Sequence, residues 1–224
     1  MSPSVLPVSA TGEELVSLLP AGPRALLGIT GAPGAGKSTL ASFLAGCVAA
    51  GVVVPMDGFH LADVELTRRG LLDRKGAPET FDAWGYAALL ARLRSRPDHV
   101  VMAPGFSRDL EQPLAGAVPV APSATLVVTE GNYLLLAAAP WAAVRASLDA
   151  VWHVTCPDSV RIPRLVARHE EFGKSPAEAR AWVERVDQAN AALVEAAAGR
   201  GDLVLDLSGW GCPDFHRPAG ESGS

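Results

Sequence analysis

Cysteine is scarce in this chain. The 224 residues include three cysteines, and they lie far apart at positions 47, 156 and 212. Neither the short spacing of a metal-binding cysteine motif nor the even number of a disulfide framework is present. The cysteine pattern therefore excludes a disulfide-stapled fold and a cysteine-based metal site, and it is typical of proteins of a reducing cytoplasm.

Positive charge and long apolar runs are also lacking. Lys and Arg number 19 against 24 Asp and Glu, which gives a net charge of -5 and no broad attraction for nucleic acid or an anionic membrane. The longest apolar run, residues 134–144, is too short for a membrane span and contains Pro140. The first residues show no signal peptide. We therefore expect a cytoplasmic protein that binds neither nucleic acid nor membrane; a homodimer stays open.

What the chain does have is apolar character. Hydrophobic residues make up 49% of the sequence, enough for a sizeable core. We expect one domain over residues 1–208, beginning with an irregular arm over residues 1–10. A loose tail over residues 209–224, rich in Gly, Pro and Ser, is expected to follow it.

Apolar stretches alternate with helical patterns along that domain. Strands are predicted at about 25–30, 52–54, 125–129, 150–155 and 203–207, with helices at about 38–50, 82–95, 158–171 and 175–198. Residues 99–103 are a further short candidate strand, and 104–123 are expected to be mostly loop. Residues 58–81 show little periodicity and are expected to form a long functional excursion. The alternation predicts an α/β fold with a mostly parallel five-stranded sheet and helices on both faces.

The most specific motif follows the first of these strands. It fits the phosphate-binding pattern G-x-x-x-x-G-K-[ST] at every defined position, and its residues are Gly31, Ala32, Pro33, Gly34, Ala35, Gly36, Lys37 and Ser38, with Thr39 next. In such a loop, backbone N–H groups surround an anionic phosphate at a helix N-terminus. The lysine then reaches the β/γ-phosphates and the serine hydroxyl ligates magnesium. The motif predicts a site for Mg²⁺ and ATP.

Two acids follow predicted strands, where ligands of parallel sheets bind. Asp57 comes at the end of the strand after the loop helix and can take a proton from a substrate hydroxyl during phosphoryl transfer. Because Asp57-Gly58 is also a common turn pair, a plain turn role is an equal alternative. Glu130 ends another buried strand, as a magnesium-organising acid would.

Arginines share one face of the helix predicted at 158–171. Arg161, Arg164 and Arg168 are spaced i, i+3 and i+7. A planar guanidinium group matches phosphoryl oxygens, so this stripe suits a lid that closes over phosphates. The alternative is a solvated face paired with Glu170 and Glu171.

The excursion after Asp57 is also rich in basic residues. Arg68, Arg69, Arg74 and Lys75 lie there, and from their charge alone they are as compatible with a solvated loop as with an acidic substrate. Asp82, at the end of this segment, is expected either to cap the following helix or to contact substrate, and we favour contact.

Several segments together resemble one superfamily, that of uridine kinase, phosphoribulokinase and type I pantothenate kinase. The matching pieces are residues 31–38, Met56-Asp57-Gly58-Phe59-His60, the stretch 74–82, Thr129-Glu130-Gly131-Asn132-Tyr133, and 161–175 with Asp187 and Asn190. The whole is most similar to short bacterial uridine-kinase-like proteins, some of which carry the name fructose transport system kinase. Residues 104–108 occupy the region where pantothenate kinases carry a tyrosine and a histidine, so the resemblance does not imply pantothenate as substrate.

The resemblance implies ATP-dependent transfer to a hydroxyl of a small metabolite. It implies Asp57 as base, Lys37 and Arg168 as catalytic cations, Arg164 beside the nucleotide, and Ser38 and Glu130 around the metal. Acceptor contacts are then expected from His60, Arg74, Lys75, Phe81, Asp82 and Tyr133. If residues 74–82 do not form that pocket, Arg108 and Asp109 are the next candidates.

The sequence therefore predicts an ATP:alcohol phosphotransferase with a nucleoside, a pantothenate-like molecule or a sugar as acceptor. One alternative is an NTPase that serves as a switch or assists a transporter. A second is a nucleotide-binding regulator without turnover, against which the intact Lys37, Ser38, Asp57 and Glu130 argue.

Overall fold

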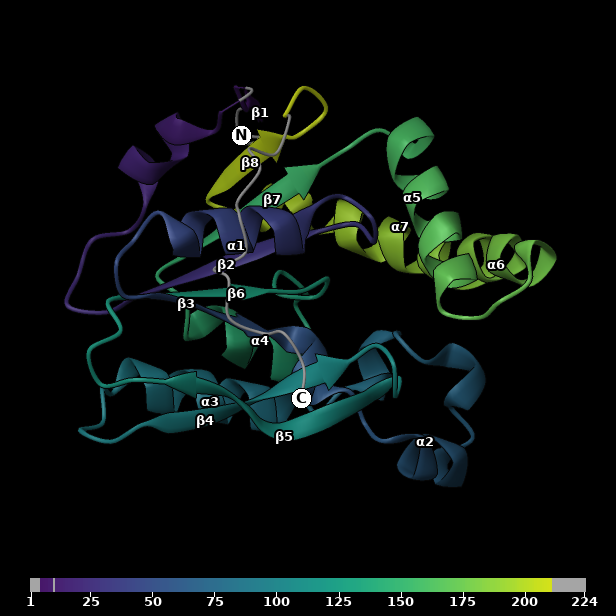
Figure 1. Ribbon diagram of the computed structural model, residues 1–224, viewed down its shortest axis with the longest axis horizontal. Helices are drawn as coiled ribbons and strands as arrows, with labels where there is room; N and C mark the ends of the chain where they lie inside the picture. The colour runs from purple at the N-terminus through teal and green to yellow at the C-terminus, as the bar shows by residue number, and fades with distance from the viewer. Residues whose placement is uncertain (1–4, 10, 211–224) are drawn as a thin grey trace, which may run out of the picture.

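A six-stranded parallel sheet forms the centre of the computed structural model, which describes residues 5–9 and 11–210 (Figure 1). Its spatial order is β1 (Val5–Pro7), β8 (Leu203–Asp206), β7 (Ala150–Thr155), β2 (Ala25–Gly31), β6 (Leu126–Glu130) and β3 (Gly51–Pro55). The predicted parallel α/β fold is confirmed, with one strand more than the five expected. Part of the N-terminal arm forms the sixth, because Val5 to Pro7 pair in register with Val204 to Asp206. The expected tail over 211–224 and the arm residues 1–4 and 10 lie outside the described residues.

Side-chain alternation along the strands divides the interior into two cores. Leu26 and Val127 belong to one core, and their neighbours Leu27 and Val128 belong to the other, as a period of two requires. Helices α3 (Ala83–Arg94), α4 (Ala139–Ala146) and α7 (Gln188–Ala196) contribute to the first core, and α1 (Lys37–Gly46) to the second. Helices therefore cover both faces of the sheet, as predicted. No helix in the described part of the chain is long and apolar enough to cross a membrane.

A β-hairpin replaces the loop that was predicted for residues 104–123. Strands β4 (Val101–Ser107) and β5 (Gln112–Val120) pair antiparallel, and the register shifts between Ala103 and Gly105 around Pro104. In a two-stranded ribbon each strand has one open side, so a proline without an N–H is tolerated there. Val101, Ala103 and Val120 are fully buried in the first core and anchor the hairpin. The prediction of a loop was wrong because it took the prolines as evidence against strands. Proline is tolerated on the side of a strand that pairs with no neighbour.

The excursion after β3 closes on itself. It begins with a short helical turn over Met56–Phe59, continues through α2 (Asp63–Arg69) and ends with two more turns, Leu72–Arg74 and Pro78–Thr80. His60 and Phe81 form an isolated antiparallel bridge, and Asp82 N donates to Phe59 O at 2.8 Å. The two ends of the excursion therefore meet next to Asp57.

The helical arm that carries the arginines is nearly continuous. After α5 (Asp158–Glu171) come α6 (Pro176–Trp182), a π-helical segment (Val183–Asp187) and α7. Figure 1 shows α5 and α6 projecting beyond one end of the sheet. Ser175 caps α6 in a capping box with Glu178, a pattern that the sequence Ser-x-x-Glu favours. The single long helix predicted over 175–198 is thus interrupted by a π segment, a feature often found at functional sites.

Candidate active site

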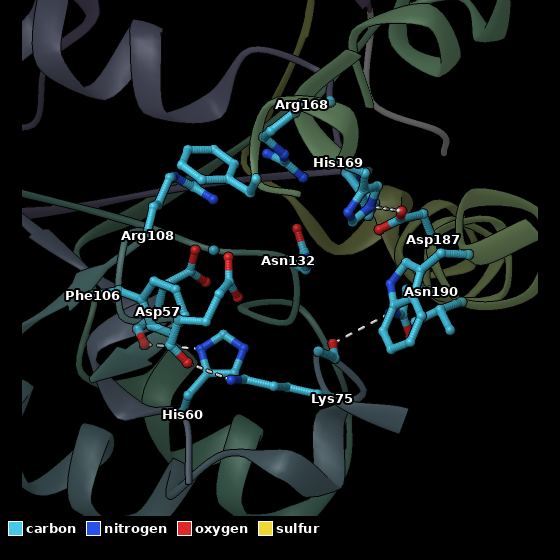
Figure 2. A pocket seen from close by; sticks show the side chains of 18 of the residues that line it. Asp57, His60, Lys75, Phe106, Arg108, Asn132, Arg168, His169, Asp187 and Asn190 are labelled. Carbon is cyan, nitrogen blue, oxygen red and sulfur yellow. Dashed lines mark hydrogen bonds and ion pairs between the residues drawn. The ribbon is translucent and has the colours of Figure 1, made fainter. Parts of the chain in front are cut away.

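The carboxyl ends of three neighbouring strands bring the predicted site together. Ile29 of β2 and Pro55 of β3 both lie opposite Glu130 of β6 in the sheet register. The phosphate loop follows β2 and Asp57 follows β3, so parallel pairing places the loop, Asp57 and Glu130 at one edge. A cavity of about 340 Å³ opens there, and Figure 2 shows the side chains that line it.

The phosphate loop depends on two glycines with left-handed backbone. Gly34 has φ of 79° and Gly36 has φ of 95°, a region that disfavours side chains. A Cβ at Gly34 would also come within 2.8 Å of the Arg161 carbonyl oxygen. These turns end the loop at the N-terminus of α1, which provides unpaired N–H groups and a positive helix dipole for an anion.

Lys37, Ser38 and Glu130 form the polar end of the cavity. The Lys37 ammonium donates to Ala32 O at 3.0 Å, and the Ser38 hydroxyl donates to Glu130 Oε1 at 3.1 Å. Burial lowers the pKa of Lys37 to about 8, although the charges of Glu130 and Asp57 oppose the shift. Burial, aided by Asp57, raises the pKa of Glu130 to about 7. Each charge is only partly compensated, as expected where a charged ligand is still to bind.

Asp57 faces the cavity from the turn after β3. Within residues 5–9 and 11–210, no hydrogen bond or ion pair engages its carboxylate. His60 Nδ1 lies 2.9 Å from Asp57 O. Because a carbonyl only accepts, this Nδ1 carries the proton. Burial lowers the pKa of His60, which makes the ring neutral at pH 7 and leaves Nε2 as an acceptor.

Aromatic rings form a wall around His60. Its ring centre lies 4.0 Å from that of Phe81 and 5.0 Å from that of Phe106 on the hairpin. Both phenylalanines line the cavity. The structure therefore brings the predicted His60 and Phe81 together beside Asp57, and it adds Phe106.

Lys75 lies on the same side of the cavity. Its ammonium donates to Asp63 Oδ1 at 2.7 Å and to the carbonyl oxygen of Glu111. The next residue, Gly76, accepts hydrogen bonds at its carbonyl from Tyr133 and from Asn190 Nδ2, the latter at 3.3 Å. Tyr133 is fully buried and is not among the residues that line the cavity. Its hydroxyl instead holds residues 74–82, the predicted acceptor segment, in place through Gly76.

Two further predicted acceptor residues, Arg74 and Asp82, do not line the cavity. Arg74 points away from it and pairs with Glu79 at 2.6 Å, with 59% of its side chain exposed. Asp82 Oδ1 accepts from Gly85 N at 2.8 Å and caps α3. Of the two predicted roles of Asp82, the structure shows the helix cap, and Asp82 is not among the residues that line this cavity.

The arginine stripe of α5 separates into two parts. Arg168 lines the cavity, and both Arg164 and Arg168 line a second hollow that runs along the phosphate loop to Thr39. Arg161 is 4% exposed and donates to Asp158 at 2.8 Å and to Gln188, so it joins α5 to α7. Two of the three arginines, Arg164 and Arg168, therefore lie beside the phosphate loop, and their contact with phosphate stays a prediction.

Several residues that line the cavity were not predicted from the sequence as site residues. They are Phe106, Asn132, His169, Lys174, Trp182, Asp187 and Asn190. Arg108, which the sequence offered only as a second choice, lines the cavity as well. His169 Nε2 lies 2.8 Å from Asp187 Oδ2, which joins α5 to the π segment. No local pattern marks this pair, because the two residues belong to different helices.

Known proteins are similar to this chain in sequence. A protein of Schizosaccharomyces pombe named "Putative uridine kinase" is 32% identical over 216 residues, which are 91% of this chain and 92% of that protein. The pantothenate kinase of Mycolicibacterium vanbaalenii is 31% identical over 49% of this chain and 37% of its own length. A scan of protein-family models found no match.

Among solved structures, one titled "putative fructose transport system kinase" from Silicibacter sp. TM1040 superposes with a TM-score of 0.76. It is 39% identical, and the match covers 85% of this chain and 98% of that one. The similarity therefore extends over nearly the whole length of two relatives. The chain belongs to the uridine-kinase-like family of P-loop kinases and is a small-molecule kinase.

Proposed function

We propose that this kinase transfers the γ-phosphoryl group of ATP to a hydroxyl of a small polar metabolite, with Asp57 as general base. One observation carries the proposal. A single cavity is lined by Lys37 and Ser38 of the phosphate loop, by Asp57, and by His60 and Phe81. A phosphoryl donor and an acceptor hydroxyl can therefore lie in one space, as direct transfer requires.

The residues at the loop fit Mg²⁺ and ATP. Lys37, Arg164 and Arg168 are the cations for the triphosphate, and the hollow along residues 34–39 extends away from the cavity for the rest of the nucleotide. Ser38 and Glu130 offer two oxygens next to each other, which suits an ion that takes few protein ligands and several phosphate or water oxygens. The metal would neutralise charge on the β- and γ-phosphates.

Asp57 is suited to the role of base by its position and its lack of partners. Its carboxylate faces the cavity between the loop cations and the aromatic wall, and the described residues leave it free to accept from a hydroxyl. The neutral Nε2 of His60 offers a second acceptor beside it. Two hydrogen-bond acceptors side by side suit a substrate that presents more than one hydroxyl group.

Arg168 would stabilise charge on the transferred group when α5 closes. It is half-buried in the cavity, and its burial, reinforced by the charge of Arg108, lowers its pKa. A guanidinium held in a water-poor site acts strongly on developing negative charge. Closure would also exclude water and prevent hydrolysis of ATP.

A switch NTPase is the alternative, and the acceptor end of the cavity argues against it. Such a protein needs to position one water molecule, whereas the space next to Asp57 is walled by Phe81 and Phe106 and has polar side chains beyond them. An aromatic wall with a few fixed polar groups is typical of a small-molecule site.

The test is ADP release with and without a library of hydroxylated metabolites. We expect acceptor-dependent release, and we expect Asp57→Asn to lower acceptor phosphorylation by roughly 100-fold or more while ATP affinity is kept. Asp73→Asn, an exposed acid of the same excursion, is the matched control and should behave as wild type. A folded Asp57→Asn variant with near-normal kcat would rule out Asp57 as base.

A further inference from the structure

Arg108 lies in the cavity without an acidic partner. It follows β4, and its Cζ atom lies 6.0 Å from the ring centre of Phe172 at the end of α5. In the part of the chain that the structure describes, no ion pair and no hydrogen bond engages its guanidinium group. Arg108 is exposed, and its charge acts on Glu130 without forming an ion pair with it. Such a guanidinium group beside an aromatic ring is available to bind an anion.

Two other cations that line the cavity, Lys174 and Arg168, also form no ion pair with an acid within the described residues. Lys174 lies 4.9 Å from the ring centre of Trp182. The charge of Lys174 acts on Glu178, and those of Asp187, Asp57 and Glu111 act on Arg168, without direct contact. Figure 2 shows Arg108 and Arg168 on the same side of the cavity, facing Asp57. Arg108 and Arg168 repel each other, and Asp187, Asp57 and Glu111 offset part of that repulsion. An anion bound between the two guanidinium groups would relieve the rest. The triphosphate accounts for Arg168, which belongs to the hollow along the loop, and leaves Arg108 and Lys174.

The hairpin ties Arg108 to the acceptor side. Phe106, two residues before it, packs against His60 with the ring centres 5.0 Å apart and the ring planes tilted by 48°. A Cβ at Gly58 would come within 2.5 Å of Pro104 O, so the hairpin packs directly on the turn that carries Asp57. Arg108 is therefore built on the same wall as the groups that would receive the acceptor hydroxyl.

We propose that the acceptor carries an anionic group, a carboxylate or a phosphate ester, and that Arg108 binds this group with help from Lys174. The inference rests on the proposed kinase function and names its substrate class: a hydroxylated acid or a phosphorylated polyol. Asp57 would receive the hydroxyl, the ring wall would contact the carbon skeleton, and Arg108 would bind the oxyanion in a two-pronged contact.

Paired acceptors test the substrate class. We suggest D-glycerate against glycerol, pantothenate against pantothenyl alcohol, and fructose 6-phosphate against fructose, with ADP release and product mass spectrometry as readouts. At least one acid should be phosphorylated with kcat/KM roughly 100-fold above that of its neutral partner. The carboxylate and phosphate pairs distinguish the two oxyanions. Equal or better turnover of the neutral partners would overturn the inference and leave the kinase proposal intact.

Substitution at Arg108 tests its role. Arg108→Gln should raise the KM of the anionic acceptor by roughly 10- to 100-fold, with the KM of ATP unchanged, because a charge-assisted hydrogen bond is lost. Arg108→Lys should recover part of the affinity. Arg200→Gln is the control, since Arg200 is exposed and far from the cavity in the fold. An equal fall in kcat for every acceptor, and in ATP hydrolysis without one, would assign Arg108 to the transferred phosphoryl group instead.

A binding measurement decides the matter even if no acceptor of the library is used. With Mg²⁺ and AMP-PNP saturating the nucleotide site, inorganic phosphate and acetate are titrated against Tm at constant ionic strength. Wild type and Arg200→Gln should gain thermal stability from at least one of these anions, and Arg108→Gln should lose most of that gain. Identical responses in all three proteins would overturn an anion site at Arg108.

Discussion

At the scale of single residues, neighbours in sequence have opposite fates. Arg74 and Lys75 are adjacent cations, yet Arg74 pairs with Glu79 in solvent while Lys75 lines the cavity and is held by Asp63 and the Glu111 carbonyl. A residue type that is right for a role is therefore not enough. The partner that holds the side chain decides whether it faces the ligand.

Lys37 illustrates a buried charge that is present for a ligand. Lys37→Ala should abolish turnover, because losing a cation aimed at the phosphates costs on the order of 3 kcal/mol or more in the barrier. Calorimetry should also show weakened ATP binding, with Arg200→Ala as control. Normal activity together with unchanged ATP affinity would contradict the assignment.

The same residue allows a stability test. The pKa of Lys37 falls to about 8 mainly because burial disfavours the ammonium. A folded-state pKa below that of the unfolded chain means that the charged form opposes folding at pH 7. Lys37→Met, of similar length and without charge, should therefore melt at the same temperature as the ligand-free wild type or higher.

At the scale of elements, Asp82 ends the acceptor segment and begins α3. Asp82→Ala should cost about 1 kcal/mol of stability through the lost cap, and lower Tm by roughly 2–4 °C for a chain of this size. Asp82→Asn keeps a capping oxygen and is the matched control. Thermal melts with acceptor kinetics check this: a rise in acceptor KM without a fall in Tm would restore Asp82 to the substrate.

The β4–β5 hairpin shows how an element acquires function. Its prolines made the segment resemble a loop in the sequence. In the fold it contributes Phe106 to the aromatic wall around His60 and Arg108 to the cavity lining. Because the hairpin pairs with no strand of the main sheet, it can differ between relatives without disturbing the parallel core. We expect acceptor choice to reside there.

At the scale of the whole molecule, helices α5 and α6 form an arm that projects beyond one end of a well-buried sheet (Figure 1). Helix α5 buries only Arg161 and Leu165, and α6 buries only Ala179, whereas β2 is buried along its entire length. An arm with so few buried contacts is expected to open at low cost. Two of its cations, Arg164 and Arg168, line the hollow along the phosphate loop.

Closure of this arm can be measured by hydrogen exchange. Mg²⁺ and AMP-PNP should slow amide exchange in α5 and α6 more than in α3, because bridging phosphates would hold Arg164 and Arg168 against the loop. AMP, which lacks the phosphates that these arginines would reach, is the matched control ligand. Protection confined to residues 31–39 would show that α5 is not a lid.

The sequence by itself determined the features that local order encodes. The strand, loop and helix around Lys37, the capping box at Ser175 and the parallel sheet follow from residues that are neighbours in the chain, and an eight-residue motif leaves little freedom in its backbone. The positions of Asp57 and Glu130 at one edge also followed, because parallel strands align their carboxyl ends.

Only the tertiary structure decided which side chains share the cavity. The capping role of Asp82, the burial of Tyr133 under Gly76, the pairing of His169 with Asp187 and the approach of Arg108 all join segments far apart in sequence. In irregular segments no period of two or 3.6 fixes the direction of a side chain, so long-range packing and hydrogen bonding set it. For that reason the chemistry of the donor end was predictable from the residues, and the acceptor end emerged from the fold.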